Sequence, residues 1–312
     1  MKPEERESKP AAVPKDATQA GEVRARWAWV EPAVWTDRML TALESGVKGG
    51  KWFSLMDKVY APRALEAAFA RVKANKGAAG VDHQTVATFG RKAEENLERP
   101  SLELRSGKYV PLPARLVWIP KPGSAEKRPL GIPTARDGAA QTALCAALEP
   151  IFERDFAEHS YGFRPGRGRK DAPRRVDGLR RRGYTWVVDA DLKSYFDTIP
   201  REPLMERVKV KVADGKALAL LEAYLGQRVM DGMESWTPDG GAPQGAIISP
   251  LLSNVYLDPL GADVGRGEAR FARRDEIEES HFLEKSKVVA NAFFGLLGGG
   301  LGHVAADSPC VR

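Results

Sequence analysis

The chain has 312 residues, 43% of them hydrophobic and 29% charged, which is enough apolar material for a sizeable core in one large domain or two ordinary ones. A wholly disordered chain is excluded, and the sequence holds no run of about 18 apolar residues that could span a membrane. The first residues are too polar for the apolar region of a signal peptide. The two cysteines, Cys145 and Cys310, lie far apart, so a disulfide framework is excluded and a reducing, cytoplasmic location is expected.

The chain is mildly basic, with 48 Lys and Arg residues, 42 Asp and Glu residues and a net charge of +6. Such an excess suits a polyanionic partner without demonstrating one. The excess is concentrated between Arg164 and Arg182, a stretch with nine basic residues and only two acidic ones, Asp171 and Asp177. This stretch is either a phosphate-binding surface, which the concentration of charge favours, or the solvated face of a helix.

The N-terminal part is predicted to be helical after a disordered tail. Residues 1–24 are rich in Lys, Glu, Pro and Ala with almost no large apolar side chains, a composition typical of disorder. Apolar residues at helical spacing predict a helix over 36–43, capped by Thr36 or Asp37, and a second helix over 64–74. The glycine- and alanine-rich residues 77–82 predict a tight loop before the next helix.

The rest of the chain mixes strands and helices without an internal repeat. Residues 115–120 predict a strand that a basic turn joins to residues 129–133, which makes a hairpin with a cationic tip. The mostly apolar run 185–191 ends in acidic residues and fits a buried strand with carboxylates at its C-terminal end. The other expected elements are helices over 137–151, 203–212 and 215–225, a hairpin through 228–240, and a helix that begins at the N-cap Ser249 with Pro250 at its first position.

Two segments could line a cleft that holds a charged ligand. Asp191 at the end of a predicted strand, with an aromatic residue four positions later, suits a site for a divalent cation beside a sugar, because magnesium prefers hard oxygen ligands. The alternative is that Asp191 simply caps the next turn. In the second segment, 241–254, glycines allow close backbone approach, Gln244 can present its amide, and the helix that begins at Ser249 favours phosphate. The alternative there is an ordinary loop that leads into a helix.

Two further segments carry clustered cations. Residues 160–168 interleave aromatic residues, glycines and arginines, a pattern in which rings and guanidinium groups stack on bases while charges meet phosphates. Lys121, Lys127 and Arg128 at the hairpin tip could hold a triphosphate. Either segment could instead be solvated surface. The four histidines are scattered without zinc-site spacing, and neither a phosphate loop nor a nucleophile elbow occurs.

Taken together in this order, these segments resemble a bacterial group II intron reverse transcriptase, the intron-encoded protein that doubles as a maturase. The resemblance runs from about Val34 to Leu260. It rests on these blocks: 35–40, 54–59, 76–82, 119–121, 128–133, 148–152, 161–165, Asp191 with Phe196 and Asp197, and 243–254.

The resemblance implies an α+β fold, the fingers and partial palm of a right-hand polymerase, with helices packed on an antiparallel sheet. It also implies four regions along the chain: a disordered tail (1–24), a helical N-terminal extension that binds template RNA (25–100), the fingers and partial palm (101–260), and a divergent, family-unrelated tail (261–312).

The same resemblance assigns roles to single residues. Asp191 matches the first catalytic aspartate, a ligand of two Mg²⁺ ions together with the carbonyl of Leu192. Lys121 and Arg128 match residues that grip the incoming triphosphate, Phe196 the residue that stacks under its sugar, and Gln244 a residue that lines its pocket. The RNA contacts expected from the basic stretch are Arg164, Arg167, Arg169 and Lys170. The implied reaction is two-metal nucleotidyl transfer with an RNA template, a DNA primer and a dNTP, without a membrane partner.

One departure from the family affects the chemistry. The family continues into a hairpin with Tyr-Ala-Asp-Asp, whereas Asp258-Pro259-Leu260 here leads into residues without any Tyr-x-Asp-Asp, which suggests a frameshift, recombination or fragmentation of the gene. With Asp191 as the sole matching carboxylate, two adjacent dications would have too few ligands. We therefore expect no DNA polymerisation by this chain alone. Three alternatives stay open: a polymerase completed by a second polypeptide, a non-catalytic intron-RNA-binding fragment, and a degraded remnant.

Overall fold

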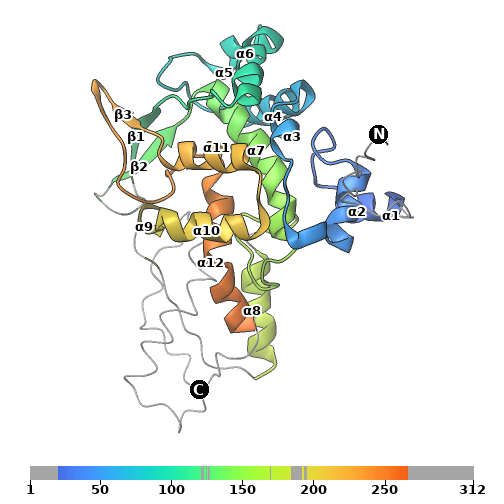
Figure 1. Ribbon diagram of the computed structural model, residues 1–312. Helices are drawn as coiled ribbons and strands as arrows, with labels where there is room; N and C mark the ends of the chain where they lie inside the picture. The colour runs from blue at the N-terminus through green and yellow to red at the C-terminus, as the bar shows by residue number, and fades with distance from the viewer. Residues whose placement is uncertain are drawn as a thin grey trace, which may run out of the picture.

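The computed structural model describes residues 20–120, 123, 125, 127–168, 170–183, 192 and 195–265. In this part the N-terminal region is entirely helical, as expected (Figure 1). Its elements are α1 (Ala20–Arg26), α2 (Asp37–Ser45), the short helix η1 (Lys48–Gly50), α3 (Met56–Val59), α4 (Pro62–Ala74), α5 (Val86–Gly90) and α6 (Ala93–Ser106). The predicted helices over 36–43 and 64–74 are confirmed as α2 and α4, and the Thr36 side chain caps α2 by accepting a hydrogen bond from the backbone N–H of Met39.

Helix α1 begins inside the stretch whose composition predicted disorder. Val23 is buried, and Arg24 donates hydrogen bonds to the Trp35 carbonyl (2.7 Å) and the Asp37 carboxylate (2.8 Å). The prediction of disorder is therefore wrong for residues 20–24, because contacts with α2 order a segment whose own sequence is weakly apolar. Residues 1–19 lie outside the described part.

Helix α7 (Ala135–Glu153) is the centre of the molecule and confirms the predicted apolar helix over 137–151 (Figure 1). Buried residues lie on all its faces, which is typical of a helix surrounded by other elements. Helices α3, α4, α6 and α12 (Ser249–Gly265) pack against it. Trp35, fully buried, donates its indole N–H to the Ala146 carbonyl at 2.9 Å and so attaches the N-terminal helices to α7.

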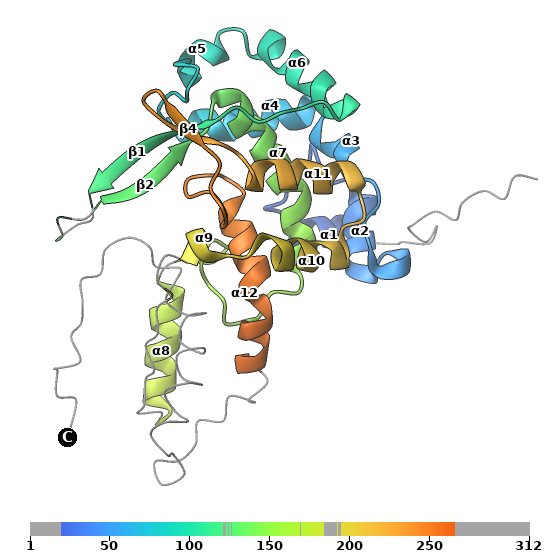
Figure 2. The same cartoon turned by 60° about the vertical axis from the view of Figure 1, so that its left-hand side comes forward.

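A small sheet lies beside this helical core, with strand order β2-β1-β3-β4 (Figure 2). Strands β1 (Ala114–Pro120) and β2 (Lys127–Ile132) form the predicted hairpin, and β3 (Val229–Asp231) and β4 (Glu234–Trp236) form the second one. The two hairpins join through a parallel pair, β1 with β3. The expectation of an antiparallel sheet is thus wrong for this pair, because the long helical connection between β2 and β3 lets β3 return in the same direction as β1. The strand expected over 185–191 lies outside the described residues.

The remaining helices follow the sequence prediction closely. Helices α10 (Arg201–Lys211) and α11 (Gly215–Leu225) confirm the two helices expected there, and the single turn α9 (Tyr195–Thr198) precedes them. The basic helix α8 (Asp171–Arg181) lies at the opposite end of the molecule from α5 and α6 in both views (Figures 1 and 2). Helix α12 continues to Gly265, into the segment expected to diverge from the family. None of the described helices combines the length and the apolar character needed to cross a membrane.

Candidate nucleotide and nucleic-acid site

Residues 241–248, in the loop between β4 and α12, form hydrogen bonds to two elements that are distant from each other in sequence; we call them the 241–248 loop. The backbone N–H of Gly131 in β2 donates to the Gln244 carbonyl at 2.7 Å. On the other side, the N–H of Ala242 donates to the Phe196 carbonyl in α9, also at 2.7 Å. The loop therefore fixes the position of the β1–β2 hairpin relative to the segment that follows Asp191.

Two glycines make this close approach possible. Gly241 has φ +77°, and a Cβ atom there would lie 2.5 Å from the Phe196 carbonyl oxygen. Gly245 has φ +97°, and a Cβ atom there would overlap the Gly131 carbonyl oxygen. Both positions lie in the left-handed region, which strains residues with a side chain. The glycines thus allow this loop to pack against the backbone of other segments, whereas the sequence had suggested that they allow close approach to a ligand.

The loop brings two of the expected nucleotide-site residues onto neighbouring segments. The Gln244 side-chain amide donates to the Asp197 carboxylate at 2.6 Å, one residue after Phe196. Gln244 and Phe196 are both half-buried, whereas Asp197 is exposed. Ser249, expected as an N-cap, donates its hydroxyl to the Pro243 carbonyl at 2.8 Å and so closes the loop. The roles of Gln244 and Phe196 in nucleotide binding stay predictions.

The other residues expected at this site are only partly within the described structure. Arg128 is exposed on β2, opposite Ile119 of β1 and on the strand that holds the loop. The Leu192 side chain is exposed. Asp191, Lys121 and Arg169 lie outside the described residues. In the part of the chain that the structure describes, no three His, Cys, Asp or Glu side chains converge as a metal site would need.

Arg164 differs from the expectation. Its side chain is only 3% exposed and forms a bidentate ion pair with Glu153 of α7, with nitrogen–oxygen distances of 2.8–3.1 Å. Its remaining donor reaches the carbonyls of Ala157 (2.6 Å) and Ser160 (2.9 Å). The guanidinium thus anchors the 154–164 loop to α7 and is shielded from solvent, and the RNA contact expected of Arg164 stays a prediction. In sequence, such an arginine cannot be distinguished from an exposed one.

The neighbouring cations are more accessible. Arg167 is half-buried, donates to the Ser160 carbonyl at 3.0 Å and lies over the Tyr161 ring at 5.6 Å. Burial, and secondarily the charge of Arg164, lowers the pKa of Arg167. Lys170 is exposed at the N-terminal end of α8.

Helix α8 itself carries internal ion pairs. Asp171 pairs with Arg174, and Asp177 pairs with both Arg180 and Arg181, all at helical spacing on exposed side chains. These pairs fit the solvated-face interpretation of the basic stretch for these three arginines. The accessible positive charge expected for a phosphate-binding surface is thus reduced along the helix.

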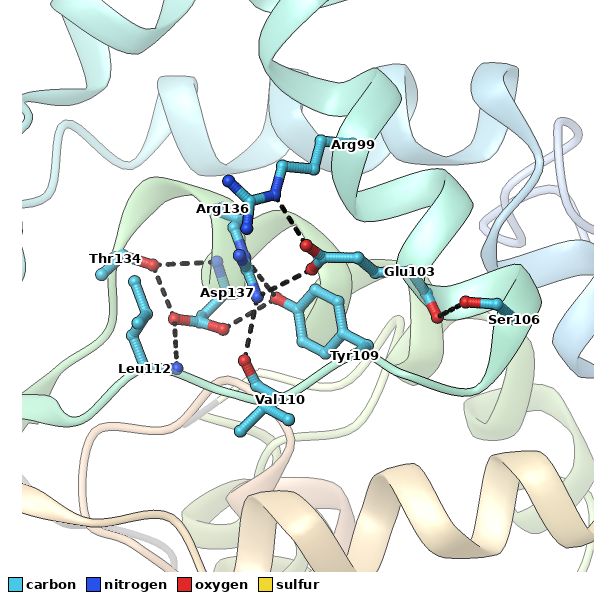
Figure 3. Close-up of polar contacts among 9 residues, drawn as sticks. All are labelled: Arg99, Glu103, Ser106, Tyr109, Val110, Leu112, Thr134, Arg136 and Asp137. Carbon is cyan, nitrogen blue, oxygen red and sulfur yellow. Dashed lines mark hydrogen bonds and ion pairs between the residues drawn. The ribbon is translucent and has the colours of Figure 1, made fainter.

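A buried polar cluster that the sequence did not reveal fixes the hairpin to α7 (Figure 3). Asp137, fully buried in the first turn of α7, accepts hydrogen bonds from the Tyr109 hydroxyl (2.7 Å), the Thr134 hydroxyl (2.6 Å) and the Leu112 N–H (3.2 Å). Arg136 lies over the Tyr109 ring and donates to the Val110 carbonyl at 2.9 Å. The cluster holds both the chain that enters β1 and the chain that leaves β2.

Two opposing effects act on the pKa of Asp137 in this cluster. Burial raises the pKa of Asp137, while the hydrogen bonds from Thr134 and Tyr109 and the charge of Arg136 lower it in part. The one signal in the sequence was the spacing of Thr134 and Asp137 before an apolar helix, which resembles a capping box. It could have indicated the helix start, but not the partners from residues 109–112.

Comparison with known proteins agrees with this architecture. The family model described as "Reverse transcriptase (RNA-dependent DNA polymerase)" matches residues 119–272, which include the end of β1, all of β2, α7, α9 and the 241–248 loop. The chain is 36% identical to protein YkfC of Escherichia coli over 241 residues, 75% of this chain and 58% of YkfC. It is 34% identical to the group II intron-encoded protein LtrA of Lactococcus lactis over 216 residues, 68% of this chain and 35% of LtrA.

The fold is therefore that of a reverse transcriptase, an α+β fold with fingers and part of a palm, as the sequence predicted. The chain belongs to the reverse transcriptase family, on the branch of the group II intron-encoded reverse transcriptases and maturases. It spans little more than half the length of YkfC and about a third of LtrA. A solved structure titled "Partial Cas6-RT-Cas1--Cas2 complex" is similar at a TM-score of 0.47 and 24% identity, over 71% of this chain and 37% of that chain, too distant to carry an argument.

Proposed function

We propose that this chain is the template- and nucleotide-binding part of an RNA-directed DNA polymerase that acts on group II intron RNA. One observation supports this most: the 241–248 loop holds β2, which carries Arg128, against α9, which carries Phe196, with Gln244 between them. Arg128 would contact the triphosphate, Phe196 the sugar, and Gln244 the rest of the incoming nucleotide. Helical residues 25–100 would contact the template RNA, and residues 101–260 would form the fingers and partial palm.

The reaction would need divalent metal ions, and we propose Mg²⁺. When bound, such ions would activate the primer 3′-oxygen and stabilise the leaving pyrophosphate. Asp191 and the Leu192 carbonyl are the expected ligands. The described residues do not by themselves make a metal site. A second polypeptide with the missing aspartates would complete the palm. We also propose a cytoplasmic location, because two cysteines far apart in sequence fit a reducing compartment.

The test is nucleotide-dependent binding of a labelled DNA primer on an RNA template, measured by fluorescence anisotropy with the purified chain in Mg²⁺. A dideoxy-terminated primer prevents extension. We expect the complementary dNTP to tighten the complex, and Arg128→Ala and Gln244→Ala to weaken that effect about 10-fold or more, since hydrogen bonds to charged groups contribute about 1.5–3 kcal/mol. Arg105→Ala, an exposed arginine near the C-terminal end of α6 and outside the region assigned to the template, is the control and should leave the effect of the dNTP unchanged.

Two outcomes would count against the proposal. Absence of any binding to the RNA–DNA hybrid would refute it outright. Binding that no dNTP strengthens would instead favour the second candidate, a non-catalytic intron-RNA-binding fragment, which the absence of Tyr-x-Asp-Asp in these 312 residues also favours. Primer extension with an ordinary primer should give no incorporation by this chain alone.

A further inference from the structure

Phe163 has an unusual combination of backbone conformation and exposure. Its φ is +53°, in the left-handed region that only a few per cent of residues with side chains occupy. Its side chain is 51% exposed, although burial of a large apolar side chain stabilises the folded protein. A strained backbone that holds an apolar ring in solvent contributes nothing evident to stability, and such outliers cluster at sites of function.

The structure fixes this conformation from both sides. The preceding Gly162 carbonyl accepts a hydrogen bond from the Asn254 side-chain amide of α12 at 3.0 Å. The following Arg164 is held in the buried ion pair with Glu153 of α7. The turn is therefore attached to two helices of the core, and the ring of Phe163 is presented to solvent from a rigid support.

The turn also lies next to the element that follows Asp191. The Ser253 carbonyl of α12 accepts a hydrogen bond from the Tyr195 hydroxyl of α9 at 3.1 Å. Asn254, the next residue of α12, binds the turn that carries Phe163. Consecutive residues of one helix thus attach both the candidate nucleotide site and the exposed ring.

Two cations follow the turn that carries Phe163 along the chain. Arg167 lies half-buried four residues further on, and Lys170 is exposed beyond it. In the structure as described, Lys170 has no ion pair with a carboxylate. An exposed aromatic ring and cations on one short segment are a combination that binds single-stranded nucleic acid, since the ring stacks on a base and the cations meet phosphates.

We propose that Phe163 stacks on an unpaired base of single-stranded RNA, with Arg164 as the buried residue that positions the turn and Lys170 as a phosphate contact. The proposal rests on the RNA-binding function proposed above and adds the residue that contacts a base. Because stacking needs a base that is not already in a helix, the ring should matter for single-stranded RNA and not for a perfect RNA duplex.

The experiment measures binding of a fluorescently labelled single-stranded RNA oligonucleotide of mixed sequence to the full chain. Phe163→Ala and Phe163→Gly should both weaken binding about 5-fold to 100-fold, and Phe163→Trp should retain it, because base–aromatic stacking contributes about 1–3 kcal/mol per base. Binding of an RNA duplex should not change. The control is Trp236→Ala, which should leave RNA binding unchanged, since Trp236 is an aromatic residue of β4, 43% exposed and outside the region assigned to template RNA.

Two further measurements separate stacking from a structural role. Phe163→Gly should have a higher Tm than Phe163→Ala, because glycine tolerates the positive φ. The slope of log affinity against log salt should stay unchanged in Phe163→Ala and fall by about one in Lys170→Ala. If Phe163→Ala and Phe163→Gly both bind the single-stranded RNA as tightly as the wild type does, this inference alone is overturned. If the wild type does not bind RNA, the proposed function is overturned as well.

Discussion

Replacement of Asp137 tests whether the buried polar cluster holds the hairpin to α7. The Asp137 carboxylate is fully buried and accepts three hydrogen bonds, from Tyr109, Thr134 and Leu112. Asp137→Ala leaves these donors without an acceptor, and each unsatisfied buried donor costs about 1–3 kcal/mol. Water can reach the half-buried backbone of Leu112, so we expect a total loss of about 3–5 kcal/mol in the free energy of unfolding. That is a large share of the total for an ordinary domain, about 5–15 kcal/mol.

Asp137→Asn should reduce the free energy of unfolding by less than Asp137→Ala does. The amide keeps the shape and one acceptor oxygen, and it removes the cost of burying a charge, which is the main reason for the raised pKa of Asp137. It loses the stronger hydrogen bonds that a charged acceptor makes. The balance predicts a loss of about 1–2 kcal/mol.

The assay is urea unfolding followed by circular dichroism, with variants compared at equal m-values. Asp239→Asn, an exposed carboxylate near the hairpin β3–β4, is the control and should change stability by less than about 0.5 kcal/mol. Amide hydrogen exchange in β1 and β2 should accelerate in Asp137→Ala, because their attachment to α7 is lost. A loss below about 1 kcal/mol in Asp137→Ala, or equal losses in Ala and Asn variants, would refute the reasoning.

Two other predictions concern the 241–248 loop and α7. Gly241→Ala should destabilise the chain by about 2 kcal/mol or more and reduce dNTP-dependent binding, because its Cβ would lie 2.5 Å from the Phe196 carbonyl oxygen at a φ of +77°. The adjacent control is Gly240→Ala, whose Cβ would make only an ordinary contact at 3.8 Å. Equal losses of stability in the two variants would contradict the role of the close approach. Burial, with the charge of Glu153 second, raises the pKa of Glu149 to about 7. The folded state therefore holds a proton that the unfolded state releases, and this contribution to stability, up to about 3 kcal/mol, is present below the unfolded pKa and is lost as pH rises from about 4 to 7. Unfolding measured across that range should show a steeper decline in the wild type than in Glu149→Gln, which keeps the contribution of Asp137, and parallel pH profiles for the two would contradict it.

Local chemistry in the sequence was sufficient for most of the elements and for the family. Thr36 caps α2, and apolar residues mark α4 and α7. These features depend on residues within a few positions of one another, so they can be read along the chain. The order of the motifs then sufficed for the reverse transcriptase resemblance, which the family comparison confirms.

Only the tertiary structure decided which side chains meet. Arg164 and Lys170 look equivalent in a basic stretch, yet one is buried against Glu153 and the other is exposed. The parallel pairing of β1 with β3 likewise depends on a connection through several helices. The partners of Asp137 come from residues 109–112, and those of Phe163's turn from α7 and α12. Burial and hydrogen-bond partners depend on segments that meet only when the core packs, and no local pattern in the sequence records that packing.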